Sequence, residues 1–531
     1  MNIFKNYYYL ITENHKITSP YILLSIINYA TTIISPIISG KFLNTISKYN
    51  IYELYKITYY FIIVTIIQVL CSYTTNILFT KVSLNSDLQL KSKIYTHVYN
   101  TPYINISQFS PAYVANRIDN DSKTIVNFIF SHMVTISLNT LKFIIIIAIL
   151  FKINKKISVT VILILIINLI LYFIYKKPLF RHSHKVQEKI NEYFNQQNEY
   201  FSLIKSIKQN SWKEIFDQKI EKKFVDFLKE DLDFVKIKQM YLNSNSLLHN
   251  GAIVYLMLLC GREIINHNMN IGDFIIFNTY FSNLTNVLSY FIQFGSTYQQ
   301  VLVSDHRINE IMDFPTNCNG NYKIQQIDDI HIKNLTFEYN KNTVLFNKFN
   351  CSFKKSNIYA IVGDNGKGKS TMIDLLIGIN NSYKGDIYYN DINLKEIDKE
   401  SLKENNISIV EQNPELIYDT LFSNITAGIK NYNRTKLDFL TGLFDLSGMD
   451  LSQNSNFINK LSGGEKQKIC IIRNLLKDSD LFILDEPTSA LDKSSKSELI
   501  NILKSIKTNK IIILITHDKD LMDIADEVIQ L

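Results

Sequence analysis

The sequence predicts a multidomain membrane protein, with an all-α transmembrane domain of about six helices with long cytosolic extensions, followed by an α/β domain of the P-loop NTPase class. Three observations support this prediction. The chain has 531 residues, which is more than one hydrophobic core usually serves. Long runs of Ile, Leu, Phe and Tyr alternate with basic polar stretches over roughly the first 300 residues. Strand-like and helix-like runs around a glycine-rich loop then follow.

Six segments approach the length of about 20 apolar residues that a helix needs to cross a bilayer. The third and fourth are the most apolar, and only the short basic turn KINKK separates them. The others carry Ser, Thr, Asn and Gln, as expected for helices that line a polar cavity or pack on each other. The six predicted spans are Tyr21–Leu43, Ile57–Thr80, Ile125–Phe151, Ile157–Tyr175, Leu247–Ile265 and Phe274–Tyr298.

Two long polar stretches, residues 81–124 and 176–244, are predicted to be cytosolic extensions of these helices. They hold more Lys and Arg than the three opposite loops, which places them and both chain ends in the cytosol. The leading residues lack the pattern of a signal peptide, so we expect either an amphipathic surface helix or an ordinary lead-in. A linker at 315–329 divides a transmembrane domain, residues 1–314, from an ATPase domain, residues 330–531.

The charge and the cysteines exclude some classes of function. The formal net charge of +7 comes from Lys residues spread through polar loops, without the basic block that a nucleic-acid surface needs. The five cysteines have no close pair and no spacing suited to a metal, so buried or reduced thiols are expected. Nucleic acid is therefore not an expected partner. Membrane lipid is an expected partner because of the apolar spans.

A phosphate-binding loop is predicted between the apolar strand Ile358–Val362 and a helical run that begins at Met372. Glycines here let successive backbone N–H groups face a phosphate at the N-terminus of a helix. Lys369 is expected to reach the β- and γ-phosphates of ATP, and the Ser370 hydroxyl to bind Mg²⁺. The predicted nucleotide-binding residues are Gly363, Asp364, Asn365, Gly366, Lys367, Gly368, Lys369, Ser370 and Thr371.

A second predicted strand, Leu481–Leu484, ends in two carboxylates, Asp485 and Glu486. Asp485 is expected to hold Mg²⁺ through water, and Glu486 to orient and activate the attacking water. An apolar strand that ends in Asp-Glu is common, so this pattern alone does not identify the site. The assignment also depends on the motif that lies between this strand and the phosphate loop.

That motif is Leu461–Glu465, which reads LSGGE and precedes the helical run KQKICIIRNLLK. It resembles the signature of the ATP-binding cassette (ABC) family, and the whole chain is similar to an ABC half-exporter. The resemblance implies that two ATPase domains pack head to tail, so that one chain supplies only half of each ATP site. The signature residues that would close over the ATP of the opposite chain are Ser462, Gly463, Gly464 and Glu465.

The same resemblance assigns four smaller elements. Tyr339 would stack on adenine. Gln412 would contact Mg²⁺ and report to the membrane domain, and His517 would contact the γ-phosphate. Asp492, in the sequence SALD, would lie at the dimer interface. The predicted catalytic residues are therefore Glu486, Gln412 and His517. The predicted Mg²⁺ ligands are Ser370, Gln412 and Asp485.

Two polar segments resemble the coupling loops of ABC exporters, where a short helix meets the ATPase domain. The first is Thr101–Asp121, which reads TPYINISQFSPAYVANRIDND. The second is expected within Ser206–Lys223, around Trp212.

Three departures from the family pattern stand out. The stretch SQNSNFINK before the signature has no acidic residue, and the segment between Gln412 and Leu461 is short, which implies a trimmed helical subdomain. The sequence stops at Leu531, soon after His517, without the family's usual closing strands and helices. We expect this compact end to weaken the dimer contacts or leave them to the membrane helices.

The predicted function is ATP-driven export of a substrate that the sequence does not identify. The expected partner is a second copy of the chain or an unlike half-transporter, in a bacterial inner membrane with the ATPase domain in the cytoplasm. The alternative is an ATP-gated receptor or channel in which hydrolysis is secondary, and Glu486 counts against it. A non-membrane ABC ATPase of translation or DNA repair is disfavoured by the six apolar segments.

Overall fold

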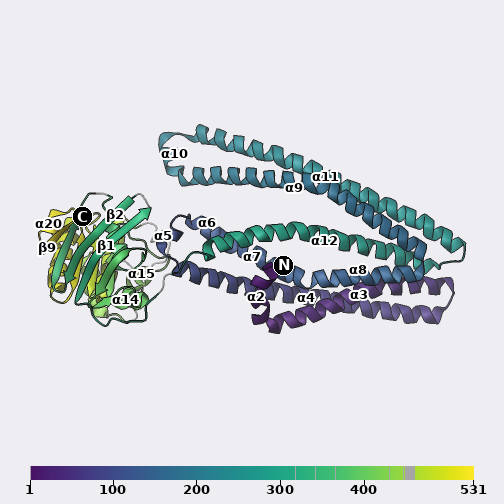
Figure 1. Ribbon diagram of the computed structural model, residues 1–531, viewed down its shortest axis with the longest axis horizontal. Coiled ribbons are helices and arrows are strands. Elements are labelled where there is room, and N and C mark those ends of the chain that lie inside the picture. The colour runs from purple at the N-terminus through teal and green to yellow at the C-terminus, as the bar shows by residue number, and fades with distance from the viewer. Residues whose placement is uncertain are drawn as a thin grey trace. The chain divides into compact units, whose positions relative to one another are not determined.

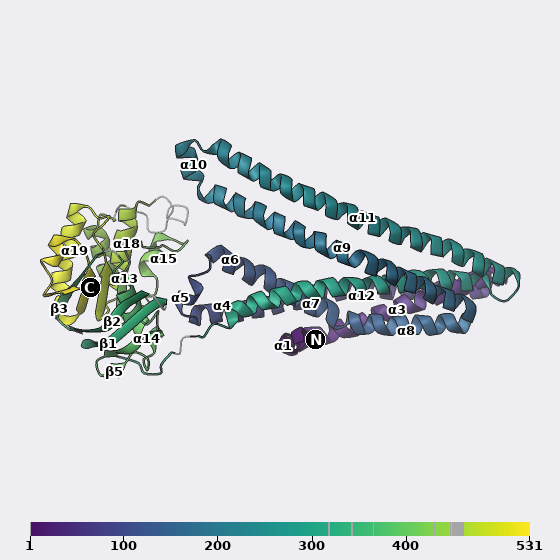
Figure 2. The same ribbon diagram turned by 45° about the horizontal axis from the view of Figure 1, so that its top comes forward.

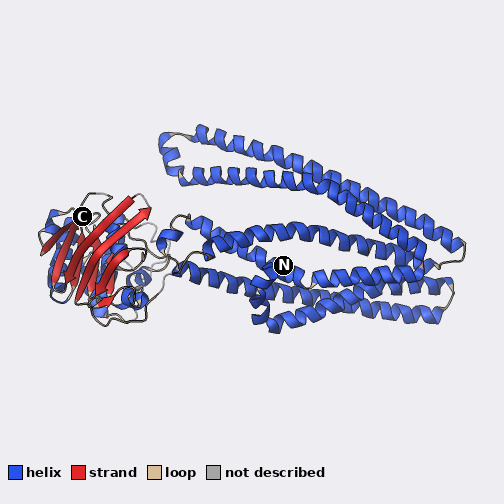
Figure 3. Cartoon of the chain, viewed as in Figure 1, coloured by secondary structure: helices blue, strands red, loops and turns tan. Residues whose placement is uncertain are grey.

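The chain forms two compact units in the computed structural model. It describes residues 2–531 except 317–318, 341–342, 365, 430, 447 and 449–460, and residues 2, 112, 339, 340 and 343 by their backbone only. The membrane unit contains Met1–Tyr95 and Pro111–Met312, and the ATPase unit contains Thr96–Ser110 and Asp313–Leu531. In Figure 3 the described strands all lie in the ATPase unit, whereas the membrane unit is helical.

Long helices build the membrane unit, as the apolar runs predict. Each predicted span lies within these helices, and the third begins in α7 (Ser122–Met133) and continues into the next helix. Many of their Ile, Leu, Phe and Tyr side chains are exposed, which suits contact with lipid. The long helices are α3 (His15–Ser47), α4 (Ile51–Asn100), α8 (Thr135–Ile153), α9 (Lys155–Ser202), α11 (Lys213–Ile265) and α12 (Ile271–Met312).

Among the described residues, five helical segments rather than six are long and apolar enough to cross a membrane. They are His15–Ser47, Ile51–Asn100, Tyr113–Ile153, Lys155–Ser202 and Lys213–Ile265. The predicted sixth span does form a helix, α12, but its Asn, Ser, Thr and Tyr residues lower its hydropathy. Its Phe277, Tyr280 and Phe281 are fully buried in a cluster with side chains of α8, α9 and α11. Because α12 packs largely against other helices, it needs less apolar surface than a helix facing lipid.

The helices α9 and α11 run side by side as a long hairpin, and α10 (Ile204–Asn210) lies at its tip (Figures 1 and 2). The predicted second coupling segment falls at this tip, where Ser211 has the left-handed backbone angle φ of 56° and α11 begins at Lys213. The tip is therefore a sharp turn between two helices.

The predicted first coupling segment forms α5 (Tyr103–Ile106), α6 (Pro111–Asn116) and a π-helical turn, η1 (Arg117–Asp121). Within the ATPase unit, Ile104 of α5 packs against the hydrophobic core. The Phe109 ring also contacts Phe314, with ring centroids 6.2 Å apart. The α5 segment thus folds as part of the ATPase unit, although it lies between two helices of the membrane unit in sequence.

The ATPase unit contains a parallel sheet and an antiparallel sheet. The parallel sheet has the strand order β6-β7-β8-β3-β9, and the antiparallel sheet has the order β2-β1-β4-β5. The parallel strands are β3 (Asn357–Val362), β6 (Ile407–Val410), β7 (Leu481–Asp485), β8 (Ile511–Ile515) and β9 (Glu527–Gln530). The antiparallel strands are β1 (Asp329–Asn340), β2 (Thr343–Lys354), β4 (Lys384–Tyr389) and β5 (Ile392–Asn393).

The central parallel strands are buried because they are almost entirely Ile, Leu, Phe and Val. Alternate residues of these strands enter two separate hydrophobic clusters, one on each face of the sheet. The helices of the ATPase unit are α13 (Lys369–Leu376), α14 (Lys399–Asn405), α15 (Leu421–Thr426), α16 (Arg434–Leu443), α18 (Gly463–Leu476), α19 (Lys493–Ile506), η2 (Lys507–Asn509) and α20 (Lys519–Met522).

Of the three departures from the family pattern, two fall at least partly on described residues. The stretch SQNSNFINK lies outside the described residues, whereas α15 and α16 fill the described part of the helical segment before the signature. After His517, the helix α20 and the strand β9 follow, and β9 pairs in parallel with β3. The described end of the chain thus contributes to the sheet that carries the phosphate loop.

Candidate ATP site

Four neighbouring parallel strands deliver the predicted site residues to one edge of the sheet. The phosphate loop follows β3 and Asp485 ends β7, while Gln412 and His517 come just after β6 and β8. Because the carboxyl ends of parallel strands share one edge, residues distant in sequence meet there. This edge is the candidate ATP site.

The phosphate loop curls around the amine of Lys369. The Lys369 Nζ donates to the Gly363 carbonyl oxygen at 2.5 Å and lies 3.1 Å from His517 Nε2. Gly366 and Gly368 have positive φ angles of 83° and 95°, which glycine adopts without strain. The helix α13 begins at Lys369, so its N-terminal N–H groups face the same edge.

Ser370 and Asp485 are joined directly, because the Ser370 hydroxyl donates to Asp485 Oδ2 at 3.1 Å. Burial raises the pKa of the Asp485 carboxyl above its usual range, and the hydrogen bond from Ser370 opposes this shift. A hydroxyl and a carboxylate oxygen are ligands that Mg²⁺ accepts. Among the described residues, no group of three or more His, Cys, Asp or Glu side chains would hold a metal ion. The Ser370 hydroxyl and the Asp485 carboxylate fit an ion that takes its other ligands from phosphate and water.

Glu486 is held in an unusual backbone conformation beside Gln412. Its φ angle of 45° lies in the left-handed region, which non-glycine residues adopt infrequently. The Glu486 N–H donates to the Ile515 carbonyl at 2.8 Å, and the Gln412 amide donates to Glu486 Oε2 at 2.7 Å. These contacts fix the carboxylate at the sheet edge.

The signature residues form the start of α18. Ser462 caps this helix by accepting from the Glu465 N–H at 3.3 Å, and the Glu465 carboxylate accepts from the Ser462 N–H at 2.7 Å. Ser462 and Gly463 are exposed. A Cβ on Gly464 would lie 2.6 Å from the Ala490 carbonyl oxygen, so only glycine fits there. The N-terminus of α18, the positive end of its dipole, is thus exposed.

Two residues that the sequence reasoning missed link α18 to residues 486–492, which follow β7. Gln467 is 1% exposed; its amide donates to the Glu486 carbonyl at 3.1 Å and accepts from the Ala490 N–H at 3.1 Å. Lys468 pairs with Asp492 at 3.0 Å. Gln467 and Asn474 are polar residues on the largely apolar buried face of α18, and this was the available signal for Gln467.

Replacing Gln467 by leucine is expected to lower both the melting temperature and kcat. The change removes the partners of the Glu486 carbonyl and the Ala490 N–H in a partly buried place, at a cost of at most about 1–3 kcal/mol each. Thermal unfolding and ATPase assays would check this, with the exposed Gln326→Leu as the matched control. Equal effects of the two substitutions would contradict the bridging role of Gln467.

Asp374 is a half-buried carboxyl on α13 close to the site. Burial raises its pKa from 3.8 to about 6, and the nearby charges of Glu411 and Asp485 add to the shift. The pKa of the Asp374 carboxyl is higher in the folded state than in the unfolded state. Its contribution to the free energy of unfolding is therefore fully present below the unfolded pKa of 3.8 and is lost as the pH rises through about 6.

Asp374→Asn is therefore expected to raise the melting temperature at pH 8, since it removes a penalised charge. The difference from the unsubstituted protein should shrink with falling pH and disappear below the unfolded pKa of 3.8. Calorimetry of the detergent-solubilised protein over this pH range would measure it, with the exposed Asp391→Asn as control. A stabilisation that does not depend on pH would contradict the assignment.

The remaining predicted residues fall into three groups. Asp364 and Lys367 are exposed in the phosphate loop, and Thr371 is buried in α13. Asp492 caps α19, and hydrogen bonds from Ser494, Ser495 and Lys468 lower the pKa of its carboxyl. Asn365 lies outside the described residues, and Tyr339 is described only by its backbone in β1.

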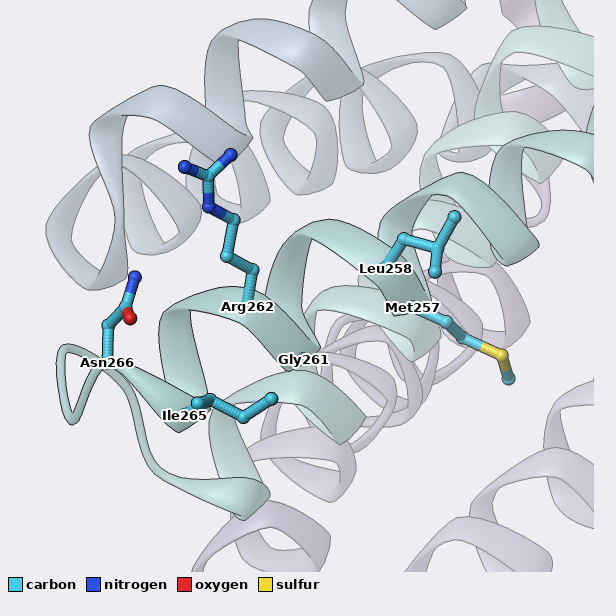
Figure 4. Close-up of a pocket in the computed structure, with 6 residues that line it drawn as sticks. All are labelled: Met257, Leu258, Gly261, Arg262, Ile265 and Asn266. Carbon is cyan, nitrogen blue, oxygen red and sulfur yellow. The ribbon is translucent and has the colours of Figure 1, made fainter.

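A shallow pocket of about 330 Å³ lies elsewhere, at one end of α11. Figure 4 shows that its walls come from this one helix end, with the Arg262 side chain extended away from the helix. It has none of the phosphate-loop or carboxylate groups of the ATP site. Its lining residues are Met257, Leu258, Gly261, Arg262, Ile265 and Asn266.

Comparison with known proteins gives matches over both units. Residues 19–288 match the family model described as "ABC transporter transmembrane region", and residues 346–489 match the one described as "ABC transporter". The transport/processing ATP-binding protein ComA of Streptococcus pneumoniae is 24% identical, over 88% of this chain and 67% of the relative. The multidrug resistance-like ATP-binding protein MdlB of Buchnera aphidicola from Baizongia pistaciae is 29% identical, over 93% of this chain and 86% of the relative.

A solved structure shares the whole fold. It is described as a bacterial Atm1-family ABC exporter with ATP bound, and it aligns with a TM-score of 0.82 at 17% identity. The alignment covers 97% of this chain and 93% of the other.

Proposed function

The chain belongs to the ABC transporter family, because the transmembrane family model alone covers just over half of it, and we propose that two copies assemble into a dimeric exporter. It is a multi-pass membrane protein of the half-transporter type, with an ATPase domain that binds ATP and couples its hydrolysis to transport.

The observation that carries the proposed mechanism is the meeting of Lys369, Ser370, Asp485 and Glu486 at one sheet edge. We assign Lys369 to the β- and γ-phosphates of ATP, where its charge offsets theirs. Ser370, Asp485 and Gln412 would hold Mg²⁺, which neutralises charge on the phosphates when it is bound.

Glu486 is assigned as the residue that orients the attacking water and accepts its proton. The hydrogen bond from Gln412 holds the carboxylate, so a movement of Gln412 changes the position of the base. His517, beside Lys369, is placed to contact the γ-phosphate.

The second half of each ATP site is assigned to the partner copy. The Ser462 and Glu465 hydrogen bonds stay within the signature turn, and the exposed N-terminus of α18 suits a phosphate on another chain. A homodimer supplies two complete sites without a further subunit. We place the protein in a bacterial inner membrane with the ATPase unit in the cytoplasm, which agrees with the bacterial relatives and with the basic polar stretches.

Transport into sealed vesicles tests this function. The protein is reconstituted with its ATPase unit outward, ATP is added outside, and uptake is measured for a panel of peptides, lipids and amphiphilic drugs. We expect ATP-dependent accumulation of at least one class and none with Glu486→Gln. An ATP-evoked ion conductance that persists in Glu486→Gln, without accumulation of any compound, would instead support a gated channel.

A further inference from the structure

A lysine lies near the middle of one membrane span. Lys142 is in α8, which ends at Ile153, so about 16 Å of helix separate it from that end. This is about half the thickness of the hydrocarbon core of a bilayer, roughly 30 Å. Placing a cation at this depth costs free energy, so such a residue indicates a functional site. The group that pairs with the cation therefore has to be identified.

The lysine is held between α3 and α12 by uncharged groups. Its Nζ donates to Asn283 Oδ1 at 3.3 Å and lies 5.9 Å from the centroid of the Tyr29 ring. Asn139, one turn earlier on α8, is 7% exposed and hydrogen-bonds with Tyr29. These four residues, Tyr29, Asn139, Lys142 and Asn283, form what we call the Lys142 cluster.

No carboxylate of this sequence is available to pair with Lys142 at that depth. The six predicted spans contain one acidic residue, Glu263, which lies beside Arg262 near the end of α11 and accepts from Asn268 at 2.9 Å. A second copy brings the same spans, so a homodimer does not supply a counter-charge either.

An aromatic region on α7 and α12 lies next to the Lys142 cluster, where Tyr290 interacts with Tyr29. Tyr290 of α12 hydrogen-bonds with His132 at 2.9 Å and with Thr135 at 3.0 Å. The His132 ring meets Phe294 edge to face at 5.1 Å, and Phe128 stacks on Phe294 at 5.5 Å. This region offers apolar ring surface beside the lysine.

We propose that the transported substrate is amphipathic and carries an anionic group, a carboxylate or a phosphate, that binds Lys142. The proposal rests on the export function above. The unpaired cation provides the recognition of the anion, and the neighbouring rings accommodate an apolar part. Helix packing alone does not require a charge here, since the Asn, Tyr and Thr hydrogen bonds already join the same helices.

The test compares head groups on one chain length. ATPase activity of the purified dimer in zwitterionic lipid is titrated with decanoate, decyl phosphate, decanol and decyltrimethylammonium. We expect the two anions to stimulate at concentrations at least tenfold lower than decanol, and the cation not to stimulate. Lys142→Met should remove this difference and Lys142→Arg should keep it, as should Lys152→Met, a control at the exposed end of α8.

Each outcome decides the proposal. Equal responses to all four head groups, including no response, would overturn it, and so would a preference for anions that Lys142→Met leaves intact. Basal ATPase activity and its loss in Glu486→Gln are measured in the same preparation. Failure of those two would reject the proposed function, whereas failure of the head-group difference alone would reject only the anionic substrate.

Discussion

Replacing Glu486 by glutamine is expected to reduce ATP turnover at least 100-fold while ATP binding is retained. A positioned general base typically contributes about 10²–10⁴-fold to a rate. Glutamine has the same shape and keeps a hydrogen bond with Gln412, but it does not accept a proton from water. Phosphate release and binding of a fluorescent ATP analogue, measured on the protein in lipid, would separate the two effects.

The matched control for this experiment is Glu396→Gln, an exposed glutamate of the same ATPase unit. It makes the same change of charge away from the sheet edge, so turnover should stay near that of the unsubstituted protein. Unchanged turnover in Glu486→Gln would reject Glu486 as the base and leave the water to be oriented by another group.

The second large effect is expected at Lys369 and Ser462, which serve opposite nucleotides in the proposed dimer. Lys369→Ala removes the only side-chain cation of the phosphate loop that lies beside His517 in the described structure. Ser462→Asp keeps a residue that caps α18 well but adds a negative charge against the phosphates of the partner's ATP. Each homodimer should lose at least about 100-fold in turnover, the range found when one donor to a transition-state charge is removed.

The sequence was sufficient to predict those parts of the protein whose structure depends on residues close together in the chain. A strand, a glycine loop and a helix must be adjacent in sequence to bind a phosphate, so residues 358–376 could be placed before the structure was known. The membrane helices followed from the length of their apolar runs. The family membership inferred from LSGGE is confirmed by the two family models.

Contacts between distant elements were not predictable in the same way. The sixth segment was expected to span the membrane like the other five, but α12 packs largely against other helices and has a lower hydropathy than a membrane span needs. Gln467 has no motif of its own, and its role depends on a contact with Glu486, which follows the end of β7. Lys142 was visible in the sequence, but its uncharged partners on α3 and α12 became known only from the fold.

Mixing the two inactive chains tests the central claim, a composite ATP site, most directly. Differently tagged Lys369→Ala and Ser462→Asp chains are co-expressed, mixed dimers are isolated, and both ATPase activity and nucleotide trapped with vanadate are measured. The account predicts that activity returns, since one site then combines an intact phosphate loop with an intact signature from the other chain. A chain with both substitutions, paired with an unsubstituted chain, should have no intact site. The opposite pattern, silent mixed dimers and an active double-substituted pairing, would show that each chain completes its own site and would contradict the account.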